Sequence, residues 1–158
     1  MREGGRKLNS AQNVHSLKDL TLRQYNRIKA LVPLVGVELI VHKDNKMLIC
    51  KRKVGPGKGK WALPGGRVQK DETLQHAVLR KAKEELGIEV KIDKQLQVNE
   101  AFFPGVYHYV VIEYLVSPVD DKPIQLDMQH SEYKWVESPD ELFEARAKAQ
   151  VLASGVLR

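Results

Sequence analysis

Several residue types and patterns are scarce in this sequence. It contains one cysteine, Cys50, in 158 residues, which excludes a disulfide framework and fits a reducing, cytoplasmic compartment. No apolar run approaches the roughly 20 residues of a membrane-spanning helix, so we expect no membrane partner. Aromatic residues make up only 6% of the chain, and no stacking platform accompanies the scattered basic residues. This pattern argues against a nucleic-acid partner.

The residues that are present describe an ordinary globular protein. Hydrophobic residues make up 42% and charged residues 29% of the chain, and its 158 residues suffice for one domain with its own core. We expect residues 1–15 to form a flexible arm, because they are polar and lack periodicity, and residues 16–158 to form a single domain. The net charge of +6 suits an anionic partner such as a nucleotide, but it is equally consistent with a role in solubility alone.

Hydrophobic periodicity predicts strands before, around and after one central helix. That helix is expected to begin at Asp71 as its N-cap and to end at Gly87. A first helix is expected from Ser16 to Leu31, and a last one from the Ser138-Pro139 signal to about Leu152. A turn is expected at residues 102–105. The expected strands cover residues 34–53 as a hairpin, 61–63, 88–92, 95–99, 107–116 and about 133–136. The fold class is therefore an α/β (α+β) sandwich, with a mixed β-sheet packed between helices.

The most informative stretch is the turn and helix over residues 61–88, WALPGGRVQKDETLQHAVLRKAKEELGI. At about 100° per residue, Glu85 projects into the apolar arc of the helix. A carboxylate aimed at a core is costly unless it is paired or holds a metal ion. Together with Glu84 and a nearby Gly-Gly backbone carbonyl, it offers the hard oxygen ligands that suit Mg²⁺ or Mn²⁺. The alternative is a structural cluster at the helix end, with Arg80 and Glu84 paired one turn apart.

This stretch resembles the Nudix box, the signature of the Nudix hydrolases. One residue departs from it, because the glutamate that follows the arginine of the box is replaced by Lys81. In many Nudix hydrolases that glutamate helps to activate water. The residues that match stand at the spacing of the box: Gly66, Glu72, Arg80, Glu84, Glu85, Gly87 and Ile88.

The departure at Lys81 and four further segments resemble the GDP-mannose mannosyl hydrolase branch of that family. These segments are W-x-x-PGGRVQKDETL, PLVGVELIV, HYVV and QHSEYKW, and the resemblance covers about residues 20–142. The branch also lacks the box glutamate. It shares the Nudix sandwich fold, is homodimeric, and cleaves a nucleotide sugar by water attack at the anomeric carbon, releasing GDP and an inverted free hexose.

The resemblance implies a role for each residue of the expected site. His130 matches the catalytic base, and an imidazole is available for that role near neutral pH. The implied metal ligands for Mg²⁺ or Mn²⁺ are the Gly65 carbonyl, Glu85 and Gln129, with Glu84 beside them. The residues implied to bind substrate or assist the leaving GDP are Glu38, Arg52, Arg67, Arg80 and Tyr109.

Two other readings stay open at this point. A conventional Nudix pyrophosphohydrolase of a nucleoside triphosphate or nucleotide sugar would recruit Glu84, or a base outside the box, in place of the missing glutamate. A Nudix module that senses a nucleotide without cleaving it would need neither.

Overall fold

The computed structural model describes residues 21–55 and 57–157, which form three helices and seven strands. The predicted flexible arm, residues 1–15, lies outside these described residues. The helices are α1 (Leu22–Leu31), α2 (Leu74–Leu86) and α3 (Ala145–Ser154). The strands are β1 (Leu34–Lys43), β2 (Lys46–Arg52), β3 (Trp61–Ala62), β4 (Gly65–Arg67), β5 (Val90–Phe103), β6 (Tyr107–Pro118) and β7 (His130–Val136).

The strands form one mixed sheet, as predicted. Its main path is β3-β2-β1-β6-β5, while β4 pairs with β1 and β7 pairs with β2. The central pair β1–β6 is parallel, and the other pairs of named strands are antiparallel. The predicted hairpin is β1–β2, and its turn residues Asp44 and Asn45 both adopt positive φ angles, as a tight two-residue hairpin turn requires.

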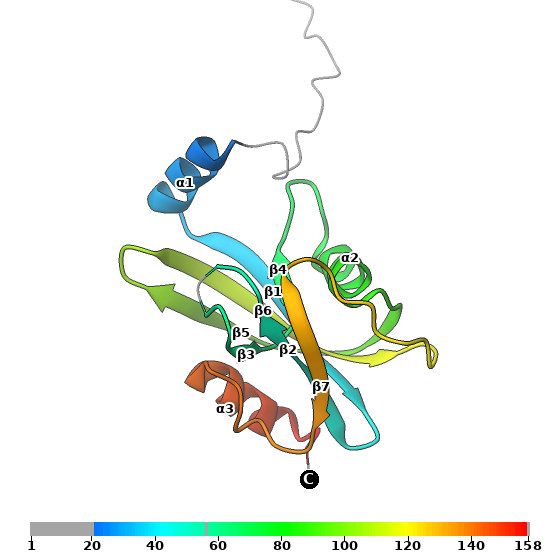
Figure 1. Ribbon diagram of the computed structural model, residues 1–158. Helices are drawn as coiled ribbons and strands as arrows, with labels where there is room; N and C mark the ends of the chain where they lie inside the picture. The colour runs from blue at the N-terminus through cyan, green and yellow to red at the C-terminus, as the bar shows by residue number, and fades with distance from the viewer. Residues whose placement is uncertain (1–20, 56, 158) are drawn as a thin grey trace, which may run out of the picture.

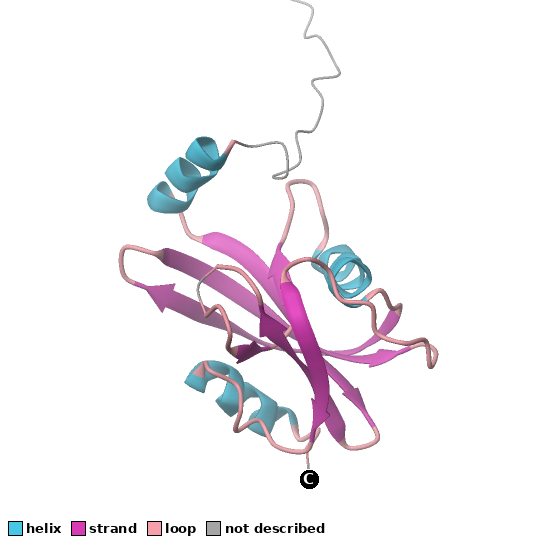
Figure 2. Cartoon of the chain, in the orientation of Figure 1, coloured by secondary structure: helices cyan, strands magenta, loops and turns pink. Residues whose placement is uncertain are grey.

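Helices α2 and α3 cover opposite faces of the sheet (Figure 1). Alternate residues of β1 serve the two faces: Leu39 packs in the core beneath α2, and Ile40 packs in the core beneath α3. Helix α1 buries none of its residues and lies beyond the start of β1, away from both cores (Figure 2). The predicted sandwich is therefore confirmed. No helix in the described part of the chain is long and apolar enough to cross a membrane.

Two predicted helix starts are wrong by a few residues. Helix α1 is capped by Thr21, whose side chain forms a capping box with Gln24, and the predicted cap Ser16 lies outside the described residues. Helix α2 is capped by Thr73, which accepts the backbone N–H of His76, and not by Asp71. Asp71 instead has a φ of 63°, a turn conformation that is incompatible with an N-cap. Gly87 ends α2 in the left-handed conformation, as predicted.

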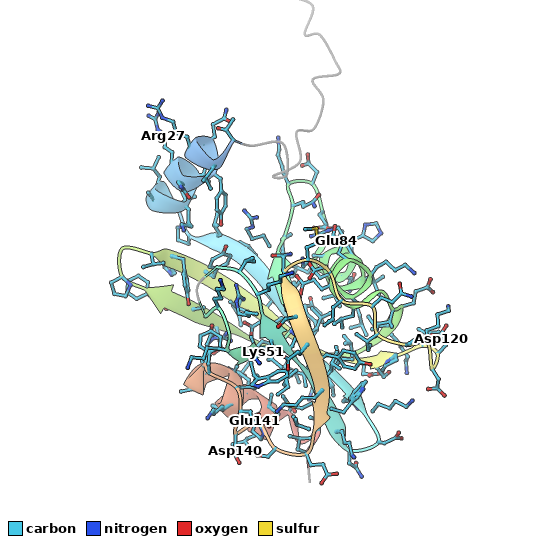
Figure 3. All side chains as sticks on the ribbon, in the orientation of Figure 1. Arg27, Lys51, Glu84, Asp120, Asp140 and Glu141 are labelled. Carbon is cyan, nitrogen blue, oxygen red and sulfur yellow. The ribbon has the colours of Figure 1, made fainter. Side chains whose placement is uncertain are left out.

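The start of the last helix was also predicted too early. Helix α3 begins at Ala145, and Asp140 and Glu141, labelled in Figure 3, lie in the segment that precedes it. Tertiary contacts account for the difference, because the backbone N–H of Phe143 donates to the carbonyl of Trp61 and holds this segment against β3.

The two short strands predicted over residues 88–99 are parts of one strand, β5, which ends at Phe103. The turn expected at residues 102–105 is present but lies slightly later, at residues 104–106. Irregularities in the pairing of β5 with β6 divide β5 into pieces that look separate in the sequence.

Candidate active site

All ten predicted site residues line one cavity of about 470 Å³. The cavity lies where the central strands meet the start of β7, the end of α2 and one face of α1. Sheet pairing brings distant residues together there, because Glu38 on β1 pairs with Gly65 on β4, and Arg52 on β2 pairs with His130 on β7. The predicted residues on the cavity wall are Glu38, Arg52, Gly65, Arg67, Arg80, Glu84, Glu85, Tyr109, Gln129 and His130.

Glu85 points inward, as its place in the helix predicted. It is 3% exposed, and both of its carboxylate oxygens have partners. One oxygen accepts the backbone N–H of Gly65 at 3.0 Å, and the other lies 2.5 Å from the Lys81 ammonium. The predicted inward carboxylate therefore exists, and in this structure a lysine of the same helix neutralises it.

Lys81 is itself buried, at 7% exposure, and packs against the Gly-Gly turn. A Cβ atom at Gly66 would lie 2.7 Å from the Cε atom of Lys81, so a larger residue at this turn position would shift the end of the lysine side chain. The ammonium also lies 3.5 Å from a carboxylate oxygen of Glu84. Glu84, labelled on α2 in Figure 3, lines the same cavity.

Arg80 is committed to other side chains and to the backbone. Its guanidinium donates to both carboxylate oxygens of Glu72, at 2.6 and 2.8 Å, to Glu84 at 3.1 Å and to the carbonyl of Arg67 at 2.9 Å. The hydrogen bond from Arg80 holds the pKa of the Glu72 carboxyl below its ordinary value. These contacts make Arg80 a brace between the start of α2, its last turn and β4.

Asp127, which was not identified from the sequence, organises two predicted residues. Its carboxylate lies 2.8 Å from Nδ1 of His130, and it accepts the backbone and side-chain amides of Gln129 at 3.0 and 2.9 Å. The backbone N–H of Asp127 donates to the carbonyl of Glu85, so this loop is tied to the end of α2. The arrangement leaves Nε2 of His130 and Oε1 of Gln129 as the remaining polar atoms of those side chains.

Two arginines offer buried donors without a protein acceptor. Nε of Arg52 and Nη1 of Arg67 are buried and have no hydrogen-bond partner among the described residues. The guanidinium of Arg67 lies 4.3 Å from the ring centroid of Tyr25 on α1, which fixes its plane. Unpaired donors in a cavity mark a place where a ligand supplies the acceptor, and guanidinium groups suit phosphate.

The two tyrosines of this wall are linked. The hydroxyl oxygens of Tyr25 and Tyr109 lie 3.3 Å apart. Burial, and then the contact with Tyr25, raise the pKa of Tyr109 above its ordinary value, so its hydroxyl stays protonated and can donate a hydrogen bond at neutral pH. Tyr25 also lines the cavity, and it was not identified from the sequence.

Glu38 and Glu144 of the cavity wall belong to an ionic cluster. Arg146 of α3 donates to Glu38 at 2.7 Å, to Glu113 at 2.7 Å and to Glu144 at 2.9 Å. Burial is the main cause that raises the pKa of both Glu38 and Glu113, and the pKa of Glu113 reaches about 7. Burial alone would lower the pKa of Arg146, but its hydrogen bond to Glu38 and the surrounding carboxylates raise it. The guanidinium therefore stays charged.

Comparison with known proteins agrees with the spacing of the box. A profile of the NUDIX domain matches residues 32–155, which is most of the chain. The chain belongs to the Nudix hydrolase family. Nudix hydrolases act on nucleotide derivatives and generally use divalent metal ions such as Mg²⁺.

Three relatives illustrate how far the Nudix likeness extends. The low-salt glycan biosynthesis protein Agl8 of Haloferax volcanii is 38% identical over 125 residues, which cover 75% of this chain and 80% of that protein. The ADP-ribose pyrophosphatase of Methanocaldococcus jannaschii is 45% identical over 82 residues, 52% of this chain and 47% of that protein. A MutT Nudix hydrolase structure from Burkholderia pseudomallei superposes with a TM-score of 0.67 at 28% identity, covering 80% of this chain and 99% of that one.

The oxygen atoms that line this Nudix cavity are of the chemical type that binds divalent ions. No group of three or more His, Cys, Asp and Glu side chains that could hold a metal occurs in the described residues. The donors available at one place are carboxylates of Glu84 and Glu85 and the amide oxygen of Gln129. Mg²⁺ takes one or two carboxylates and completes its shell with substrate phosphates and water. The residues therefore fit a metal held jointly with a phosphorylated ligand, and Lys81 is the group that a metal would meet there.

The site residues that the sequence did not reveal differ in the signals that their neighbours offered. Asp127 stands three positions before His130, and a carboxylate that close to a candidate base is a signal that sequence reasoning could have used. Tyr25 and Arg146 offered no such signal, because their partners lie 84 and up to 108 positions away along the chain.

Proposed function

We propose that this Nudix hydrolase cleaves a nucleoside diphosphate hexose, of the GDP-mannose type, in a Mg²⁺-dependent reaction with water attack at the anomeric carbon. The bond between that carbon and the diphosphate oxygen breaks, and the products are the nucleoside diphosphate and the free sugar. The observation that carries the proposal is the position of a base. His130, held by Asp127, lines the cavity, whereas the box position that usually supplies a carboxylate is the lysine bound to Glu85.

His130 is suited to accept the proton of the attacking water. Its Nδ1 contacts Asp127, which orients the ring and stabilises the imidazolium that forms when Nε2 takes up a proton. The side chain is only 7% exposed, so the ring is held in one orientation. Because this base lies outside the metal-binding helix, it can activate water for attack on a substrate atom other than phosphorus.

Arg52 and Arg67 are suited to hold the diphosphate. Negative charge grows on the leaving diphosphate as its bond to carbon breaks, and buried guanidinium donors stabilise that charge most where water is excluded. Tyr109, which remains protonated, can donate a further hydrogen bond to the same group. A divalent ion held by Glu85, Gln129 and the Gly65 carbonyl would supply charge neutralisation at the diphosphate.

The sugar end of the cavity would lie toward Glu38. Its second carboxylate oxygen is buried and has no hydrogen-bond partner among the described residues, so it can accept from a hydroxyl or amino group. The relative from Haloferax volcanii is named for glycan biosynthesis, a process that handles activated sugars. That likeness supports a nucleotide sugar in preference to a nucleoside triphosphate.

A second candidate is a conventional pyrophosphohydrolase, which attacks phosphorus. The likeness to an ADP-ribose pyrophosphatase over 82 residues favours it, and so does the presence of Glu84 in the cavity. In that case Glu84 would have to act in place of the missing box glutamate while it also contacts Arg80.

One experiment separates the candidates. The protein is incubated with GDP-mannose and other nucleotide sugars, with Mg²⁺, in ¹⁸O-labelled water, and the products are analysed by mass spectrometry. Attack at carbon places the label in the free hexose and releases the unlabelled nucleoside diphosphate. Formation of a nucleoside monophosphate with hexose 1-phosphate would overturn the proposal. Saturable binding across the panel without turnover would instead favour a sensing module.

A further inference from the structure

We propose that Lys81 is a built-in cation that competes with the divalent metal ion for Glu85, and that it thereby sets how tightly this chain binds the metal. The inference rests on the metal site of the proposed function. It does not depend on which bond of the substrate is cleaved, or on which nucleotide sugar is bound.

The first step is that no oxygen of Glu85 is vacant. One is held by the backbone N–H of Gly65 at 3.0 Å and the other by the Lys81 ammonium at 2.5 Å. A metal ion that uses Glu85 as a ligand would therefore share the carboxylate with these donors or displace one of them. The N–H of Gly65 is fixed in the β1–β4 pairing region, whereas the lysine side chain has rotatable bonds, so the lysine is the donor that yields.

The second step is that this pair differs from an ordinary surface pair. The side chains of Lys81 and Glu85 are 9% and 4% exposed. Lys83 on the same helix and Glu89, just beyond the end of the helix, are 60% and 65% exposed and lie 3.7 Å apart. Exposed pairs contribute little, whereas a buried carboxylate that loses its cation is strongly destabilised. Glu85 therefore holds Lys81 until another cation takes its place.

The third step is that Lys81 packs closely against the glycine turn. Its Cε and Nζ atoms lie where a side chain at Gly66 would begin, at 2.7 and 3.1 Å from the position of such a Cβ atom. The ammonium thus lies beside the glycine turn, Glu85 and Glu84. A divalent ion at Glu85 would either push the ammonium out of this position or bind beside a like charge, and both effects weaken metal binding.

The test is metal binding measured without substrate. Mn²⁺ is titrated into the protein and free Mn²⁺ is followed by electron paramagnetic resonance, with Lys81→Met compared against wild type. We expect Lys81→Met to bind Mn²⁺ at least tenfold more tightly. Lys83→Met is the matched control, because it removes an exposed lysine of the same helix, and its affinity should stay within about twofold of wild type. Equal or weaker binding by Lys81→Met, including no binding by either protein, would overturn the inference.

A second readout covers the case in which Lys81→Met folds poorly. Lys81→Gln keeps a hydrogen-bond donor for Glu85 but removes the charge. Without metal, both variants should have a lower Tm than wild type, because Glu85 loses its cation, and Mn²⁺ should raise their Tm by more than it raises that of wild type. Adding Glu85→Gln to either Lys81 variant should abolish the extra Mn²⁺-induced increase in Tm. A metal-induced shift no larger than in wild type would contradict the inference, whatever products the enzyme forms.

Discussion

Glu38 and Glu113 lie opposite each other on the parallel strands β1 and β6, and both carboxylates bind the guanidinium of Arg146 at 2.7 Å. Glu113 is fully buried, whereas Glu38 borders the cavity. The two adjacent carboxylates share one guanidinium, and burial raises the pKa of both. The protonation of Glu113 should therefore be visible in the stability of the fold.

The first prediction concerns stability against pH. The folded pKa of Glu113, about 7, exceeds its ordinary value of 4.5, so between these pH values the folded chain holds more protons than the unfolded chain. Stability from Glu113 is therefore greatest below the lower value and is lost as pH rises toward 7, by up to about 1.4 kcal/mol per pH unit. Urea unfolding across this range should show a shallower loss in Glu113→Gln than in wild type. An unchanged slope would contradict a raised pKa of Glu113 in the folded protein.

The second prediction concerns the cation of this cluster. Arg146→Met should destabilise the protein by about 3–5 kcal/mol at neutral pH, because it leaves Glu38 and Glu113 without their cation. The loss should be smaller in acid, where the carboxylates are protonated. Glu144→Gln is the comparison, because Glu144 is the more exposed partner at 26% and its removal should cost at most about 1 kcal/mol. Chemical denaturation measures the free energy of unfolding of both variants. Equal losses in Arg146→Met and Glu144→Gln would argue against a buried network.

The third prediction concerns the proposed base. His130→Gln should lower kcat by about 10²- to 10⁴-fold, the usual contribution of a positioned base, while the affinity for nucleoside diphosphate changes little. Asp127→Asn should also lower kcat, by less, because the imidazole remains but loses its orienting carboxylate. Steady-state kinetics and calorimetry with the diphosphate separate these effects. Full turnover by His130→Gln would remove His130 from the mechanism.

The fourth prediction concerns the phosphate donors. Arg67→Met should weaken nucleoside diphosphate binding at least tenfold, and Arg67→Lys should restore it only in part, because a lysine lacks the planar pair of donors. Tyr25→Phe keeps the ring beneath Arg67 and should bind nearly as well as wild type. Arg27→Met is the matched control, since Arg27 is exposed on α1 (Figure 3). Calorimetry should show no loss of nucleoside diphosphate affinity in Arg27→Met. A loss comparable to that of Arg67→Met would indicate a general effect of removing positive charge.

Local regularity explains what the sequence could predict. Helical spacing alone placed Glu85 on the buried face of α2, and the glycine turn with its following helix was evident from residue types. Strand alternation likewise indicated the β1–β2 hairpin and β6. Each of these inferences depends on residues a few positions apart, whose geometry is set by backbone conformation.

Competition between local signals and tertiary contacts explains the features that the sequence could not predict. Asp71 and Thr73 are both good N-caps, and the choice between them depends on the turn conformation that Asp71 adopts. The Ser138-Pro139 signal was overridden because the following segment is held by the carbonyl of Trp61. The cluster around Arg146 was hidden for a related reason, since it joins three elements that are far apart in the chain.

The order of these elements in the chain has a consequence for biosynthesis. Glu38 and Glu113 leave the ribosome before Arg146, so the two central strands are synthesised with their buried carboxylates but without the cation that neutralises them. The β1–β6 pairing cannot be buried at full stability in the nascent chain until α3 has emerged. We therefore expect the sheet to close fully only when the segment that forms α3 is available, and the cavity wall formed by Glu38 and Glu144 to assemble at that late point.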